Sequence, residues 1–241
     1  MRDSVTKKFE GGALFDIESP MAIELRRIMI RLSRSLDLDS KLCLMVTSAE
    51  RGEGKSLFAL QFSLVLAYHL TQQILLIDAD VRRPVQHTVF NVSCSPGLAD
   101  YLATSEPDQS VKALPTRVPN LKFLPAGVIG SHPSRLFSSG RFPAAIRHFQ
   151  QDHDIVILDA PPVVPVSDPL HYVEAVDGVL FLVMAGHTSR DLALRGVEIL
   201  RSVDAKILGV IANNLGEVLP YYYDKKYYGY HKERGNSNRS T

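Results

Sequence analysis

Residues 49–56, Ala-Glu-Arg-Gly-Glu-Gly-Lys-Ser, decide the fold class of this chain. They follow the apolar run 42–46 and precede a helical pattern that starts near Leu57. A strand, a glycine-rich loop ending in Gly-Lys-Ser and a helix together predict the phosphate-binding loop of a nucleoside triphosphatase. Ala49 stands where the usual pattern has its first glycine, so the match is a variant. A chance match in a plain loop is the alternative, and the flanking strand and helix argue against it.

The residue types in this loop suit phosphate chemistry. Gly52 and Gly54 let the backbone turn its N–H groups around phosphate oxygens, and the helix N-terminus adds the positive end of a dipole. Lys55 has the reach to contact the β- and γ-phosphates, and the Ser56 hydroxyl has the chemistry to hold Mg²⁺. We therefore expect ATP and Mg²⁺ at this loop.

The rest of the chain alternates strand and helix patterns. Short, nearly continuous apolar runs are typical of strands buried on both faces. They lie at 42–47, 74–77, 121–124, 155–158, 179–184 and 207–212. Helical patterns lie at 56–70, 97–103, 141–151 and 188–202, and Ser19-Pro20 begins an earlier helix. This order predicts an α/β fold with a mostly parallel sheet flanked by helices on both faces.

Composition narrows the class of protein further. The chain has 241 residues, 45% hydrophobic and 22% charged, which is typical of a globular domain. The net charge of +1 gives no bulk field that favours nucleic acid, so we expect no nucleic-acid partner. Cys43 and Cys94 form no metal or redox pattern. We see no transmembrane segment and no signal peptide, and expect a cytoplasmic protein.

Acidic residues follow two of the predicted strands. Asp78 and Asp80 come directly after the run 74–77, and Asp159 follows 155–158 in the Walker B form. Parallel strands end at one edge of a sheet, where ligands bind. We therefore expect these carboxylates beside the phosphate loop, holding metal and directing a nucleophile. The alternative is that they are ordinary turn or capping residues.

The C-terminal end has a different composition. We divide the chain into an N-terminal arm (1–18), a P-loop domain (19–219) and a flexible tyrosine-rich tail (220–241). The tail holds six of the nine tyrosines of the protein, which are Tyr221, Tyr222, Tyr223, Tyr227, Tyr228 and Tyr230. A disordered segment that packs on a partner is one interpretation, and a charge switch operated by phosphorylation is another.

Taken together, these features resemble the cytoplasmic kinase domain of bacterial tyrosine autokinases of capsule and exopolysaccharide synthesis (BY-kinases). The family's Walker A form is matched at 48–56, and its Walker A′ form, Leu-Leu-Ile-Asp-x-Asp-x-Arg-x-Pro, at 75–84. Its Ile-Asp-x-Pro-Pro at Walker B is matched at 158–162, with Leu158 in place of Ile. The tyrosine cluster is the most discriminating feature.

The resemblance implies an ATP-dependent protein-tyrosine kinase that modifies its own tail. Asp78 and Asp80 would share metal binding and activation of the nucleophile, with the division between them left open. Ser56, Asp78 and Asp159 would hold Mg²⁺, and Lys55 would neutralise charge on the phosphates. The expected nucleotide-binding residues are Arg51, Gly52, Glu53, Gly54, Lys55, Ser56, Leu57 and Asn213, the last at adenine.

The resemblance also implies partners. These are the protein itself, as a homo-oligomer with a ring as one form, a separate membrane activator of the polysaccharide co-polymerase type, and a tyrosine phosphatase. The activator would place the chain at the inner face of the cell membrane. The family's helix motif for ring assembly is retained only at Glu24 and Arg27, and Ile30 stands where its second Arg belongs. Arg82 or Arg83 would stabilise phosphate charge or make an interface salt bridge.

Two other functions remain open. A Min/Par-type positioning ATPase shares the fold and the Walker motifs, but usually carries an extra lysine where this chain has Glu50 and Arg51, and it lacks the tyrosine tail. An ATP-binding adaptor without kinase activity is the second alternative. The presence of four residues argues against it: Lys55, Asp78, Asp80 and Asp159.

Overall fold

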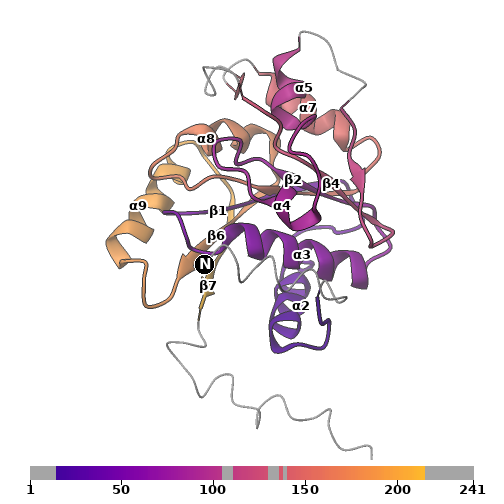
Figure 1. Ribbon diagram of the computed structural model, residues 1–241. Coiled ribbons are helices and arrows are strands. Elements are labelled where there is room, and N and C mark those ends of the chain that lie inside the picture. Colours follow the sequence, from indigo (N-terminus) through magenta and orange to yellow (C-terminus); the bar gives the residue numbers. More distant parts are fainter. Residues whose placement is uncertain (1–14, 105–110, 130–135, 138–139, 215–241) are drawn as a thin grey trace, which may run out of the picture.

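The computed structural model describes residues 15–104, 111–129, 136–137 and 140–214. Its central feature is a sheet of seven strands in the order β3-β4-β2-β5-β1-β6-β7 (Figure 1). Neighbouring strands are parallel except for the β3–β4 pair. The strands are β1 (Leu42–Ser48), β2 (Ile74–Asp78), β3 (Leu114–Pro115), β4 (Leu121–Leu124), β5 (Ile155–Asp159), β6 (Gly178–Met184) and β7 (Ile207–Asn213).

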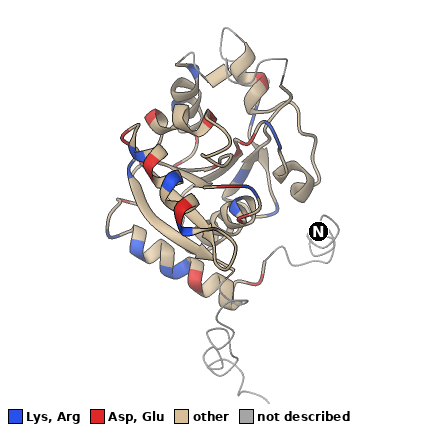
Figure 2. Ribbon diagram, turned by 90° about the vertical axis from the view of Figure 1, so that its left-hand side faces the viewer, with Lys and Arg blue, Asp and Glu red and all other residues tan. Residues whose placement is uncertain are grey.

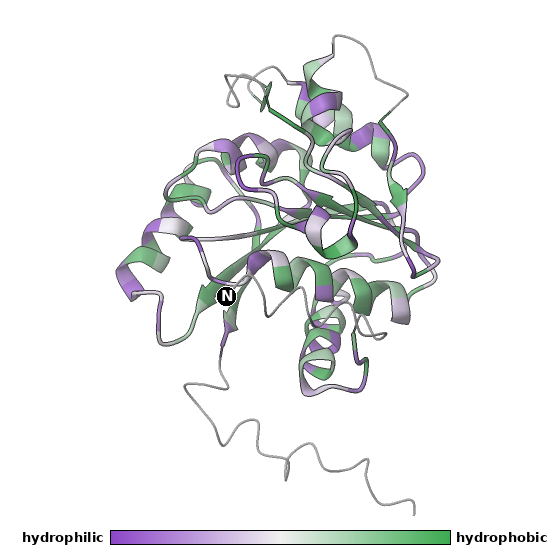
Figure 3. Cartoon of the chain, in the orientation of Figure 1, coloured by the Kyte–Doolittle hydropathy of each residue, from purple (hydrophilic) through white to green (hydrophobic). Residues whose placement is uncertain are grey.

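Each central strand sends alternate side chains into two separate cores, because successive residues of a strand point to opposite faces. In β1, Cys43 and Met45 belong to one core, and Leu42, Leu44 and Val46 belong to the other. Burial on both faces explains why these strands are nearly continuous apolar runs. The strands appear as a hydrophobic layer inside the molecule (Figure 3).

Helices cover both faces of the sheet. One core packs against α2 (Pro20–Leu32) and α3 (Lys55–His69), and the other against α5 (Leu98–Ala103), α7 (Arg141–Phe149), α8 (Asp168–Tyr172) and α9 (Arg190–Arg201). The structure also has the short α4 (Gln86–Phe90) and the 3₁₀ turn η1 (Val173–Ala175). Along the helices, Lys and Arg are interspersed with Asp and Glu (Figure 2).

The predicted fold class is confirmed, and the six predicted strands are present within a residue or two. The helix expected at Ser19-Pro20 begins there, with the Ser19 hydroxyl accepting a hydrogen bond from the Ala22 N–H at 3.2 Å. The tyrosine-rich tail predicted at 220–241 lies outside the described residues. Within those residues, no helix is both long and apolar enough to span a bilayer.

Candidate active site

The phosphate loop joins β1 to α3 at the carboxyl edge of the sheet. Its two glycines, Gly52 and Gly54, have φ values of 84° and 88°, which side-chain-bearing residues rarely adopt. A Cβ atom on Gly54 would lie 2.2 Å from Nδ2 of Asn213. The backbone angle therefore favours glycine at position 54, and a Cβ there would displace the side-chain amide of Asn213.

Lys55 is the first residue of α3, and its side chain is largely buried. Desolvation lowers the pKa of its ammonium group, while the nearby carboxylates of Asp159 and Asp80 act in the opposite direction. A lysine held at the start of a helix and facing carboxylates is suited to binding phosphate oxygens together with a cation.

The predicted strand-end carboxylates lie side by side. Asp78 ends β2 and Asp159 ends β5, and the two are paired in register on neighbouring strands. Both are fully buried. Burial raises the pKa of Asp78 well above its usual value, and the negative charge of Asp159 adds to this effect. Two carboxylates this close need a counter-charge to be ionised together, which a metal ion supplies.

Asp78 and Asp80 differ in their surroundings. One oxygen of Asp78 accepts backbone hydrogen bonds from Val85 at 3.1 Å and Gln86 at 3.0 Å, so this carboxylate caps the start of α4. Asp80 is only partly buried, and its carboxylate accepts a hydrogen bond from the Arg83 N–H at 3.1 Å. Desolvation raises the pKa of Asp80. Asp80 is therefore the more accessible of the two.

Asp159 is tied to the phosphate loop through Gln86. The Gln86 side-chain amide donates to Asp159 Oδ2 at 2.9 Å and to the backbone carbonyl of Ser56 at 2.8 Å. Burial raises the pKa of Asp159 to about 6, opposed by its interactions with Ser56 and Gln86. Its other oxygen, Oδ1, is buried without a hydrogen-bond partner among the described residues.

These residues fit a magnesium ion. A buried carboxylate oxygen without a hydrogen bond, next to the Ser56 hydroxyl, is the ligand chemistry that Mg²⁺ prefers. Within the described ranges, no group of three or more His, Cys, Asp and Glu could hold a metal ion by itself.

Glu53 and Asn213 shape the loop from within. The Glu53 side chain is fully buried and accepts hydrogen bonds from the Glu50 N–H at 2.7 Å and from the Thr188 hydroxyl. Asn213 Nδ2 donates to the backbone carbonyl of Glu53 at 2.9 Å. Asn213, expected at adenine, thus lies against the phosphate loop.

Arg82 forms an ion pair within the chain. Its guanidinium makes a bidentate ion pair with Asp168 at the start of α8, at 2.6 Å and 2.9 Å. The Asp168 side chain is fully buried. This pair provides a structural role for Arg82 that neither sequence-based interpretation included.

The fold brings most of the predicted site residues to one sheet edge, and the predicted acceptor tyrosines lie outside the described residues. Gln86, Thr188 and Asp168 were not predicted. Their partners lie 73, 135 and 86 residues away in the sequence, so no local motif marks them.

Comparison with known proteins places this chain in a family. The family model described as ParA, NUBPL iron-transfer P-loop NTPase, matches residues 39–239. The tyrosine-protein kinase YwqD of Bacillus subtilis is 34% identical over 186 residues, which cover 77% of this chain and 76% of YwqD. The chain belongs to the bacterial tyrosine-protein kinases of the P-loop NTPase class. The tyrosine-protein kinase CpsD of Streptococcus agalactiae is 32% identical over 77% of this chain and 81% of its own length.

Solved structures of this family have the same fold. The chimerical protein CapA2B2 is 28% identical, with a TM-score of 0.74 over 80% of this chain and 84% of its own. The kinase domain of the Escherichia coli tyrosine kinase ETK is 26% identical, with a TM-score of 0.71 over 78% and 73% of the two chains. MinD of Aquifex aeolicus, at 20% identity and a TM-score of 0.56, shares the fold alone. P-loop proteins bind nucleotide with Mg²⁺, which agrees with the glycine loop, Lys55 and Ser56 described above.

Proposed function

We propose that this protein is an ATP-dependent tyrosine kinase that phosphorylates the tyrosines of its own C-terminal tail, Tyr221 to Tyr230. The observation that carries the proposal is the position of Asp78, Asp80 and Asp159 beside the phosphate loop at one sheet edge. Membership of a family of tyrosine-protein kinases and a tail rich in tyrosine support it. The MinD-like alternative accounts for neither of these two facts, and the adaptor alternative accounts for the tail but not for the kinase family.

The residues divide the work of phosphoryl transfer. Backbone N–H groups of the loop and the ammonium of Lys55 bind the phosphates of ATP, and Lys55 neutralises the charge that develops on them. Ser56 and Asp159 are the residues that would hold Mg²⁺, with Asp78 next to them. When bound, Mg²⁺ neutralises phosphate charge and orients the phosphate oxygens. Gln86 keeps the Asp159 carboxylate directed at the loop.

Asp80 is our assignment for the residue that accepts the phenolic proton. A tyrosine hydroxyl has an ordinary pKa of about 10, so it needs a base as it attacks the γ-phosphate. The carboxylate of Asp78 is buried and already accepts two backbone hydrogen bonds, whereas Asp80 is partly exposed. The pKa of Asp80 is raised by burial, which makes it a stronger proton acceptor than an exposed aspartate.

The first experiment is mass spectrometry after incubation with ATP and Mg²⁺. Wild type should gain successive phosphate masses on the tail peptide, and Lys55→Met should gain none. ATP hydrolysis without tail phosphate would contradict the kinase proposal and favour a positioning ATPase, unless membrane fractions restore the labelling. Asp80→Asn should lose labelling while retaining nucleotide binding.

The same proposal extends to assembly. Labelling between copies of a homo-oligomer is tested by mixing full-length Lys55→Met with an active chain whose six tail tyrosines are all Phe. Label on the inactive copy establishes transfer between subunits, and absence of label excludes it. A ring is one form of such an oligomer. The two residues retained from the family's motif for ring assembly, Glu24 and Arg27, form an ion pair with each other within α2, at 2.5 Å.

We also place the protein in capsule or exopolysaccharide production, acting at the inner face of the membrane with a polysaccharide co-polymerase and reset by a tyrosine phosphatase. Wzc of Salmonella typhi supports this proposal: it is 26% identical over 95% of this chain, which spans only 33% of Wzc. Co-purification from membranes, and stimulation of tail labelling by the membrane fraction, test the partner.

A further inference from the structure

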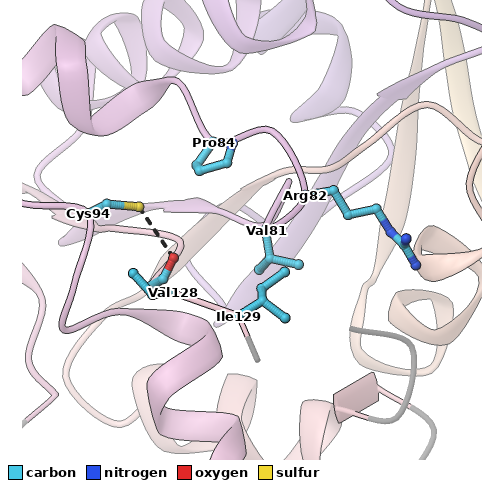
Figure 4. Close-up of a pocket in the computed structure, with 7 residues that line it drawn as sticks. Val81, Arg82, Pro84, Cys94, Val128 and Ile129 are labelled. Carbon is cyan, nitrogen blue, oxygen red and sulfur yellow. Dashed lines mark hydrogen bonds between the residues drawn. The ribbon is translucent and has the colours of Figure 1, made fainter. Parts of the chain in front are cut away.

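An open pocket lies next to the candidate active site, at the same edge of the sheet. Its volume is about 470 Å³, within the range of pockets that bind small ligands. Three segments form it: the loop after β2, the loop before α5 and the segment after β4 (Figure 4). The lining side chains are Val81, Arg82, Pro84, Cys94, Val128 and Ile129.

Most of the side chains that line this pocket are apolar. Val81 is buried, whereas Val128 is 64% exposed. The thiol of Cys94 donates to the Gly127 carbonyl at 3.3 Å, so it is already hydrogen-bonded (Figure 4). The guanidinium of Arg82 extends away from the other lining residues toward Asp168. With these side chains the pocket suits an apolar group better than an anion or a metal ion.

Val81, which lines the pocket, follows Asp80, the residue assigned as proton acceptor, in the chain. In an extended peptide, residues two apart point to the same side, about 7 Å from each other. An extended acceptor segment with one tyrosine at Asp80 could therefore place the ring of the next-but-one residue over Val81.

The tail has the composition and the length to supply both rings. Tyr221 and Tyr223 are two residues apart, and so are Tyr228 and Tyr230. β2 and β7 are separated by four strand spacings, about 19 Å. Tyr223 follows the last residue of β7 by ten residues, which reach at most about 36 Å when extended. Length therefore permits the tail of the same copy to reach the pocket.

We propose that this pocket binds one tyrosine ring of the tail while a tyrosine two residues away is presented to Asp80. The role given to the pocket rests on the proposed kinase function, whereas binding of the ring is measured without any kinase activity. A phosphotyrosine carries charge that an apolar pocket disfavours, so the bound ring is an unmodified one. The pocket would thus select which tyrosine is modified next.

Cys94 provides a direct probe of occupancy. Cys43 is fully buried, so a bulky maleimide should react at Cys94, at mildly alkaline pH because burial raises the pKa of its thiol. We compare three full-length chains without nucleotide. One is wild type, and in the other two all six tail tyrosines are replaced by Phe or by Asp. Alkylation should be about tenfold slower with the Tyr and Phe tails than with the Asp tail, the factor that burying one ring can produce. Equal rates for the three tails would overturn the proposal.

A variant in the pocket tests the site itself. Val128→Asp should abolish the difference in rate between the Phe and Asp tails, and Val210→Asp on β7 should retain it. Both residues are exposed valines, at 64% and 58%, so neither change disturbs the core. Protection that survives Val128→Asp would also overturn the proposal. A Phe tail cannot be phosphorylated, so protection of Cys94 by this tail does not depend on kinase activity. Protection of Cys94 in a protein that does not label its tail would refute the kinase function alone. Tail labelling without protection of Cys94 would refute the pocket alone.

Discussion

Thr188 and Glu53 are 135 residues apart in the sequence, and the Thr188 hydroxyl donates a hydrogen bond to the Glu53 carboxylate. The other carboxylate oxygen accepts from the Glu50 N–H at 2.7 Å. The Thr188 oxygen in turn accepts from the Met184 N–H at 2.9 Å. A single buried carboxylate thus fixes the curvature of the phosphate loop and connects it to the end of β6.

Replacing Thr188 by the isosteric valine should destabilise the protein and weaken nucleotide binding. The change leaves a buried oxygen of Glu53 and the Met184 N–H without their partner, which costs about 1–3 kcal/mol of unfolding free energy. Urea unfolding and nucleotide titration would measure the two effects. Thr188→Ser keeps the hydroxyl and should stay near wild type. Wild-type nucleotide affinity in Thr188→Val would show that the loop keeps its shape without this bond.

Alanine should be less tolerated at position 54 than at position 52, because the Asn213 side-chain amide must move. Both glycines have left-handed backbone angles, so either substitution costs about 1–3 kcal/mol in strain. Only Gly54→Ala also brings a Cβ to 2.2 Å from Asn213. We expect Gly54→Ala to lose nucleotide binding and Gly52→Ala to retain part of it. Asn213→Gly in the Gly54→Ala background should recover some stability, and no recovery would assign the defect to the backbone angle alone.

The architecture could be predicted because the strands that form it are long apolar runs. The elements that were missed are too short to carry a pattern. β3 has two residues, and α4 and α8 have five each, less than is needed for a helical period. Tertiary contacts hold them instead, as when Asp78 caps the start of α4 with two hydrogen bonds.

The candidate site could be predicted in part for a similar reason. Gly54, Lys55, Asp78 and Asp159 lie in or next to segments whose local pattern reveals their position. Gln86, which joins Asp159 to the phosphate loop, has no such signal, because its role appears only when β5 and α4 come together. The acceptor tyrosines were predicted from composition, and they remain a prediction.

Asp159→Asn should stabilise the nucleotide-free protein at neutral pH. Burial raises the pKa of Asp159 to about 6, above the value of about 3.9 expected in the unfolded chain. Between these values the folded protein retains a proton that the unfolded chain has lost, so stability falls as the pH rises through this window. Above pH 6 the full cost is present, up to about 3 kcal/mol.

Unfolding with urea at several pH values, without Mg²⁺, would reveal this behaviour. The stability difference between Asp159→Asn and wild type should grow from pH 4 to 6 and then level off, as this carboxylate becomes ionised. Asp152→Asn changes an exposed carboxylate and should give no such difference. The added stability from Mg²⁺ and nucleotide should be lost in Asp159→Asn alone. An Asp159→Asn variant that is less stable than wild type at neutral pH would refute this explanation.

Removing Arg82 should reduce stability through Asp168 rather than through the phosphates. The Asp168 side chain is fully buried, and Arg82→Ala leaves its charge without a partner. Loss of one member of a buried pair costs 3–5 kcal/mol, and we expect about 3 kcal/mol because the Arg82 side chain is 33% exposed. Arg83→Ala is the matched control on the same loop, with an expected change below about 0.5 kcal/mol.

A second variant separates this structural role from a catalytic one. Replacing both partners, with Arg82→Met and Asp168→Leu, removes the buried charge and should recover most of the lost stability. If Arg82 instead stabilised charge on the transferred phosphate, the double variant would be stable and still inactive. Recovery of both stability and tail labelling would establish that Arg82 acts by holding α8 against the loop that carries Asp80.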